Sequence, residues 1–227
     1  MKRIVLFLLI LSIAAGFPKC SGPLPADPVP VSSLSEIPEY DGSDYIVLNG
    51  DLPDFSQKDL TVETYVRFSP LDRLGRTGPG MACLGPETLP KEPRGEIGNI
   101  RPSGWHTVRY DDLIEDRYLY NRCHIIGYLL CGDNATPENL FTGTRYLNAT
   151  SMLPFEISVV RYIESTGNHV LYRCSPVYDG NDLLAKGVQI EAYSVEDEGD
   201  LRFNVFVFNI QPGITIDYAT GDSRRSG

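Results

Sequence analysis

Alternation of apolar and polar residues along the chain predicts several β-strands. Residues 62–68 alternate in this way and predict a half-buried strand. A β-branched run that begins at Tyr45 ends at Asn49-Gly50, a pair typical of tight turns. Further strands are expected at residues 118–124, 169–174, 187–193 and 201–208. The chain is therefore expected to build its core around a β-sheet.

Few segments have helical spacing. Residues 151–162 have it and predict the main helix. The apolar side chains expected on one face of this helix are Phe155, Val159 and Tyr162. Residues 125–130 are expected to continue the preceding strand or to form a short helix, and residues 137–148 to form a turn and a loop. Many strands and few helices predict an α+β fold.

The N-terminus has the pattern of an export signal. Two basic residues precede an apolar run at residues 4–11, and small residues follow up to Gly16. This run is too short for a retained membrane span, which needs about 20 residues. We therefore expect a signal peptide at residues 1–16, a Pro- and Ser-rich tether at residues 17–35, and one domain at residues 36–227.

These features predict a secreted or periplasmic protein without a stable membrane span. Lipid attachment at Cys20, which would anchor the protein at the cell surface, is the alternative. If Cys20 is lipidated or removed, the other four cysteines permit three disulfide patterns, and free buried cysteines are an equal alternative. The sequence leaves the pairing open.

The longest segment without periodicity, residues 69–104, is rich in Gly and Pro and predicts a long loop with short strand pieces such as residues 81–84. Loops this long inside compact domains usually have a function. The formal net charge is −10, yet residues 73–109 carry six basic and three acidic side chains. A local basic face is what binding of a polyanion needs, and a solvated loop of mixed charge is the alternative. The candidate phosphate contacts are Arg73, Arg76, Arg94 and Arg101.

Three histidines are present, and His124 has the most informative surroundings. It ends a predicted strand, with Asn148 24 residues downstream and Glu156 a further eight. A strand that bears a base, a connecting loop and a helix that bears an oxygen ligand would place His124 and Asn148 on opposite sides of one cavity. A single carboxamide ligand leaves most of an octahedral shell to water and substrate, as magnesium prefers.

At these residues the sequence resembles the DNA/RNA non-specific endonucleases, which have a ββα-metal motif. Asn-Arg-Cys-His at residues 121–124 is similar to the family's Asp-Arg-Gly-His, and residues 139–148 are similar to the segment that ends in the metal-binding Asn. The likeness also covers residues 45–50 and 212–221, so it spans most of the chain from Tyr45 onward. Within the family, the chain is most similar to secreted streptococcal-type DNases. The resemblance implies a mixed or antiparallel central sheet with this motif.

The resemblance also implies roles for individual residues. His124 is expected to be the general base and Asn148 the direct ligand of a magnesium ion, with manganese as the alternative ion. Glu156 is expected to orient water on the metal, Arg122 to contact phosphate or stabilise the transition state, and Asn139 to hold the active-site loop beside the substrate. The expected substrate is DNA, with RNA as a second candidate, cleaved with little sequence specificity and without a small-molecule cofactor.

Two departures from the family's pattern are visible. Asn121 replaces the usual Asp, which removes a negative charge near Arg122, and Cys123 replaces the usual Gly. A disulfide from Cys123 to Cys131 is one way for the chain to accommodate the added side chain. Two alternatives to the enzyme follow: a nucleic-acid-binding relative that cleaves poorly, and an exported adhesion or structural module.

Overall fold

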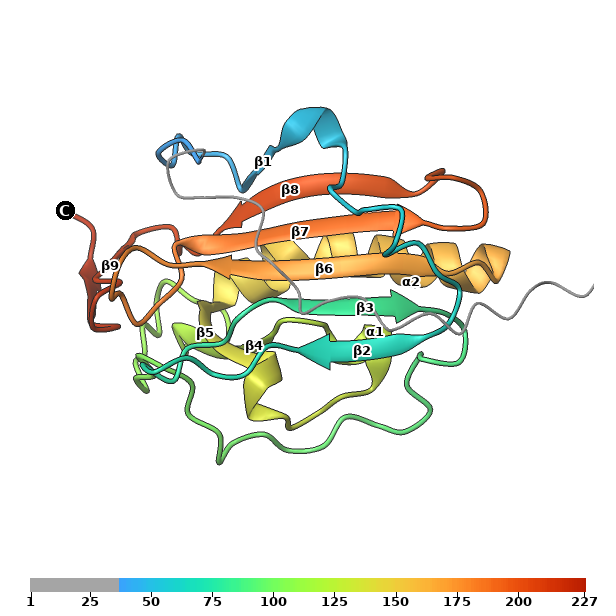
Figure 1. Cartoon of the computed structure of the whole chain (residues 1–227). Helices are drawn as coiled ribbons and strands as arrows, with labels where there is room; N and C mark the ends of the chain where they lie inside the picture. The colour runs from blue at the N-terminus through green and yellow to red at the C-terminus, as the bar shows by residue number, and fades with distance from the viewer. Residues whose placement is uncertain (1–36) are drawn as a thin grey trace, which may run out of the picture.

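A six-stranded antiparallel sheet is the centre of the computed structural model, which describes residues 37–227 (Figure 1). The strand order is β1-β8-β7-β6-β3-β2. The strands are β1 (Tyr45–Val47), β2 (Tyr65–Phe68), β3 (Gly80–Leu84), β6 (Val170–Val177), β7 (Gly187–Ser194) and β8 (Arg202–Phe208). The expected signal peptide, the tether and the lipid-attachment site at Cys20 lie outside the described residues.

The sheet contains one strand that the sequence pattern predicted only as a short piece within a loop. Residues 81–84 were expected to be a strand piece within a long loop, but β3 is a central strand, paired with β2 on one side and β6 on the other. All five of its residues are buried. A strand covered on both faces has no reason to alternate apolar and polar residues, and the surrounding Gly and Pro residues obscure it.

Helix α2 (Leu153–Thr166) lies behind the sheet in Figure 1 and packs against it. Its buried positions are Glu156, Val159 and Ile163. Full burial of an aliphatic side chain such as Ile163 contributes about 1.5–3 kcal/mol. The predicted face is confirmed in part: Phe155 and Tyr162 are half-buried and pack against the core beside Val159, while the fully buried neighbours of Val159 are Glu156 and Ile163.

A smaller antiparallel pair precedes this helix. β4 (Tyr120–His124) pairs with β5 (Leu140–Thr144), and His124 lies opposite Leu140. Between the two strands come α1 (Tyr128–Cys131) and the 3-10 turn Pro137–Asn139; after β5 comes the π-helical segment Leu147–Met152, which leads into α2. The expected loop at residues 137–148 therefore contains a strand. Together β4, β5 and α2 form the ββα arrangement that the resemblance implied.

The cysteines of the described residues are all free, so no disulfide joins Cys123 to Cys131. Room for Cys123 comes instead from a glycine on the neighbouring strand. A Cβ atom added at Gly143 would lie 2.5 Å from the Sγ of Cys123, which is closer than side chains can approach. Cys123, which replaces the family's glycine, therefore fits because residue 143 on the neighbouring strand has no side chain.

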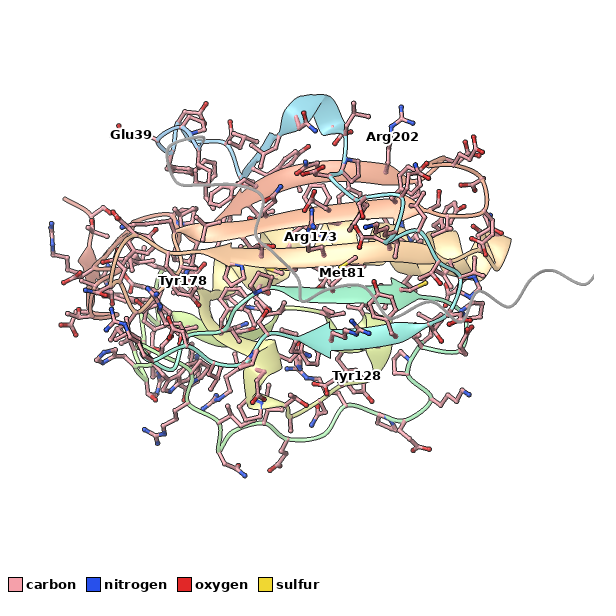
Figure 2. The ribbon with its side chains drawn as sticks, viewed as in Figure 1. Glu39, Met81, Tyr128, Arg173, Tyr178 and Arg202 are labelled. Carbon is pink, nitrogen blue, oxygen red and sulfur yellow. The ribbon has the colours of Figure 1, made fainter. Side chains whose placement is uncertain are left out.

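The sheet face opposite α2 holds a buried ion pair. Figure 2 shows Arg173 on this face, where its guanidinium lies 2.6 Å from Oε2 of Glu191. The other carboxylate oxygen of Glu191 accepts the main-chain N–H of Asp54 at 2.8 Å, and Arg173 donates to the Asp54 carbonyl at 2.9 Å. Buried charges need partners of this kind. The pair therefore attaches the segment after β1 to the sheet.

Two short strands, β9 (Ile214–Ile216) and β10 (Ser223–Arg225), form a hairpin near the C-terminus. At the other end of the domain, a 3-10 turn at Asn49–Asp51 follows β1, as the Asn-Gly pair predicts. No helix within residues 37–227 is both long enough and apolar enough to span a bilayer.

Candidate active site

His124 is the last residue of β4 and is 6% exposed. Its Nε2 lies 3.0 Å from the main-chain oxygen of Asn134. Because a carbonyl oxygen can only accept, this contact places the proton of the neutral ring on Nε2 and leaves Nδ1 free to accept another. Burial lowers the pKa of His124 below its ordinary value, and the bond to Asn134 opposes this shift. The ring is thus set up as a base at neutral pH.

The ββα arrangement brings three predicted residues to one cavity. His124 from β4, Asn148 from the π-helical segment and Glu156 from α2 all line a space of about 230 Å³. Arg94, from the long loop, and Arg145 line it as well. The cavity therefore combines a base, two oxygen-bearing side chains and positive charge.

The Glu156 carboxyl has room at this cavity because residue 127 is a glycine. A Cβ atom added at Gly127 would lie 2.6 Å from Oε1 of Glu156, so any larger residue there would displace the carboxyl. Burial raises the pKa of Glu156 to about 7, and the charge of Arg94 acts in the opposite direction. A cation in the cavity would likewise favour the charged form.

A second cavity of about 540 Å³ adjoins the first, since both are lined by Arg94 and Asn148. Arg101, Arg122 and Trp105 also line it. Arg94 and Arg101 form no salt bridge with another residue of the part of the chain described here. Their charges remain available for an anion, which makes the larger cavity a basic surface beside His124.

Arg122 faces the larger cavity but is engaged with the long loop. Its Nε donates to the Ile100 carbonyl at 2.5 Å and its Nη2 to the Gly98 carbonyl at 2.8 Å. The guanidinium carbon lies 4.0 Å from the centre of the Trp105 ring. Burial and the charge of Arg101 lower the pKa of Arg122.

Two of the predicted phosphate contacts lie elsewhere. Arg73 donates to the Asn181 side chain at 2.7 Å. Arg76 pairs with Asp72 at 2.8 Å and donates to the carbonyls of Gly180 and Asp182. Neither arginine lines the two cavities that meet at Asn148, because both are used to join their own loop to residues 180–182.

Asn139 is fully buried, so the expectation that it contacts substrate does not fit the structure. Its Oδ1 accepts the N–H of Ile126 at 2.9 Å and its Nδ2 donates to Asp133 at 3.0 Å. These bonds fix the chain just after His124. Asn139 therefore holds the loop after His124, as expected, but does not contact the substrate.

Sequence reasoning missed several residues of the site. Arg145 lines the smaller cavity and pairs with Asp116 at 2.6 Å, while Trp105 and Tyr118 line the larger one. Arg145 lies three residues before Asn148, within the segment that resembles the family, and could have been found there. Trp105 directly follows the long loop and Tyr118 begins a predicted strand, and neither lies in a segment that resembles the family's motifs.

The side chains that line the smaller cavity are suited to holding a hard divalent cation. Within residues 37–227, no three His, Cys, Asp or Glu side chains gather as a metal-binding cluster. A cation at this cavity would be held directly by one protein atom, the amide oxygen of Asn148, and otherwise by water that the Glu156 carboxyl can orient. Such oxygen donors suit a hard ion that keeps much of its hydration.

Comparisons with known proteins agree with this geometry. Residues 57–196 match the family model described as DNA/RNA non-specific endonuclease. NucA from Streptococcus agalactiae, solved with a magnesium ion bound, superposes with a TM-score of 0.71 at 26% identity, over 79% of this chain and 86% of that one. Sda1 nuclease with a bound zinc ion gives 0.61 at 26% identity, over 71% and 82%. A protein described as an extracellular endonuclease gives 0.57 at 20% identity, over 82% and 98%, a likeness of fold.

Proposed function

Because the chain belongs to the DNA/RNA non-specific endonuclease family and is an endonuclease of that kind, we propose that it uses His124 as the general base and a divalent cation at Asn148. The proposed substrate is DNA, with RNA as a second substrate. The observation that carries this proposal is the convergence of His124, Asn148 and Glu156 on one cavity, beside Arg94 and Arg101, which form no salt bridge within residues 37–227.

Each residue of the site has a role that follows from its contacts. Nδ1 of His124 takes a proton from the attacking water, while the Asn134 carbonyl holds the ring through Nε2. Arg94 and Arg101 hold oxygens of the substrate's phosphates, because their guanidinium groups have no carboxylate partner among residues 37–227. The site thus activates water on one side and binds the anionic substrate on the other.

The cation would be held by Asn148, with Glu156 close enough in the same cavity to orient the water around it. Oxygen donors without a His or Cys cluster fit magnesium, with manganese as the alternative, better than zinc. When bound, the ion supplies positive charge against the scissile phosphate and the leaving oxygen.

We also propose that the protein is exported, on the strength of the signal-peptide pattern at residues 1–16. Lipid attachment at Cys20 is the alternative route to the cell surface. N-terminal sequencing and mass measurement of the mature protein distinguish them: a start beyond Gly16 without a lipid mass supports release, and a lipidated Cys20 supports anchoring.

Digestion of plasmid DNA with and without a chelator tests the proposed function. Purified protein is expected to nick and then degrade the plasmid when magnesium or manganese is added, and to lose this activity in the chelator. Restoration by excess magnesium is the control for damage by the chelator. Cleavage that resists the chelator would contradict the metal-dependent mechanism, and binding without cleavage under every condition would favour the impaired relative.

A second prediction concerns the arginines. Arg94→Ala and Arg101→Ala are each expected to reduce the salt dependence of DNA binding by about one unit in the slope of log K against log salt, because each removes one phosphate contact. Binding is measured in chelator, so that no cleavage occurs. Arg73→Ala and Arg76→Ala are the matched controls, and their slopes are expected to equal that of the unaltered protein. Equal effects in all four variants would show that net charge, rather than placement at the cavity, controls binding.

A further inference from the structure

The segment that carries Arg94 and Arg101 has no regular secondary structure. It belongs to the long loop that passes below the sheet in Figure 1. At one end the Tyr128 hydroxyl, labelled in Figure 2, donates to the Glu92 carbonyl at 2.5 Å. At the other end Thr142 donates to the Ser103 carbonyl at 2.8 Å. Residues 93–102 thus span two anchored points.

Between these anchors, Arg122 provides the side-chain hydrogen bonds that the structure gives to the main chain of residues 93–102. Nε and Nη2 form one edge of the guanidinium, and this edge meets the carbonyls of Ile100 and Gly98 together. The plane of the group is covered by Trp105. A main-chain hydrogen bond of 3.2 Å from the Ile100 N–H to the Ile97 carbonyl completes the turn.

We infer that Arg122 is a positioning residue, which fixes the 93–102 segment so that Arg94 and Arg101 line the larger cavity beside His124. This inference rests on the proposed function for those two arginines. It differs from the sequence expectation that Arg122 meets the scissile phosphate, because two of the five N–H donors of its guanidinium and one of its faces are already engaged with the loop. Between its two anchors the segment has no regular secondary structure and one internal main-chain hydrogen bond, so the bonds from Arg122 are a large share of what fixes its conformation.

Kinetics of Arg122→Ala and Arg122→Lys test this role. Loss of the bonds from Arg122 to the loop weakens binding of the substrate and of the transition state equally. KM is therefore expected to rise about tenfold, while kcat changes less than about threefold. Lysine keeps the charge but lacks the planar edge, so Arg122→Lys is expected to resemble Arg122→Ala. Rescue by lysine, or a loss confined to kcat, would overturn the inference and assign Arg122 to the transition state.

Two measurements without substrate follow the loop directly. Trypsin is expected to cut the Arg94–Gly95 bond faster in both variants, whereas the Arg101–Pro102 bond resists it in every case because proline follows. Trp105 is the single tryptophan of the chain, so its fluorescence is expected to change when the guanidinium leaves its ring. Unchanged cutting by trypsin after Arg94 and unchanged Trp105 fluorescence would show that Arg122 does not hold the loop. These readings hold whether or not the protein cleaves DNA, so failure of the proposed function is seen separately.

Arg76→Ala is the matched control for the loss of bonds from an arginine to main-chain carbonyls. Arg76 also donates to two main-chain carbonyls, and its guanidinium lies 4.5 Å from the centre of the Tyr178 ring. Its removal is expected to lower the melting temperature but to leave KM, Trp105 fluorescence and cutting after Arg94 unchanged. If Arg122→Ala does not fold, Arg122→Lys provides the same three readings.

Discussion

His124→Ala is expected to lower the rate of phosphodiester cleavage by about two to four orders of magnitude, the usual contribution of a general base. The imidazole is expected to be neutral at pH 7 because burial lowers its pKa. Its proton lies on Nε2, which donates to the Asn134 carbonyl, so Nδ1 is unprotonated and can accept a proton. Single-turnover cleavage of a defined duplex measures the loss, and circular dichroism verifies the fold. Near-normal turnover in a folded variant would remove His124 from the mechanism.

His106→Ala is the matched control for this experiment. His106 also places Nε2 against a main-chain oxygen, that of Thr220, at 3.1 Å, but it lines neither cavity. Its removal is expected to leave cleavage unchanged. The pH profile of kcat/KM adds a second test: the base acts when unprotonated, so activity is expected to fall only as the pH drops below the lowered pKa of His124. A fall that begins well above pH 6.5 would point to another group.

Asn148→Ala is expected to abolish cleavage while His124 remains intact. The described part of the chain offers no His, Cys, Asp and Glu cluster for a metal, so the amide oxygen of Asn148 has no ready substitute. Affinity for magnesium in the absence of DNA is expected to be weak, because a site with few protein ligands holds its ion mainly through water and substrate. Titration calorimetry and plasmid digestion measure the two effects separately.

Asn148→Asp is the sharper substitution, because it keeps an oxygen ligand and adds a charge. We expect tighter metal binding with lower turnover, since the added negative charge offsets the pull of the cation on the phosphate. Asn168→Ala, beyond the other end of α2, is the control for losing an asparagine side chain. Wild-type digestion by Asn148→Ala would contradict the mechanism as a whole.

The sequence located the centre of the site better than its surroundings. His124 and Asn148 were predicted from a strand end, a helix start and the likeness of their motifs, and the structure brings both to one cavity. Arg73 and Arg76 were grouped with Arg94 and Arg101 because all four lie in one basic stretch. Position along a loop does not say which side chains turn toward a cavity, and the structure brings only Arg94 and Arg101 to the larger cavity that adjoins the first.

Two strands, β3 and β5, were the least predictable part of the fold. Both contain a glycine and do not alternate apolar and polar residues as β8 does. Burial alone is not the reason, because β6 is also buried at every residue and was predicted. Cys123 illustrates the same limit. Its sequence neighbourhood offered Cys131 as a disulfide partner, but its fit depends on Gly143, a residue on the partner strand.

The sequence by itself determined the α+β class, the family, and the choice of His124 and Asn148, because periodicity and short motifs are properties of residues close together in the chain. The tertiary structure alone decided that the pKa of Glu156 rises to about 7, that Arg122 is bound to the loop that carries Arg101, and that Asn139 is sealed from substrate. These properties arise from burial and from hydrogen bonds between residues distant in sequence, and such contacts exist only once the chain has folded.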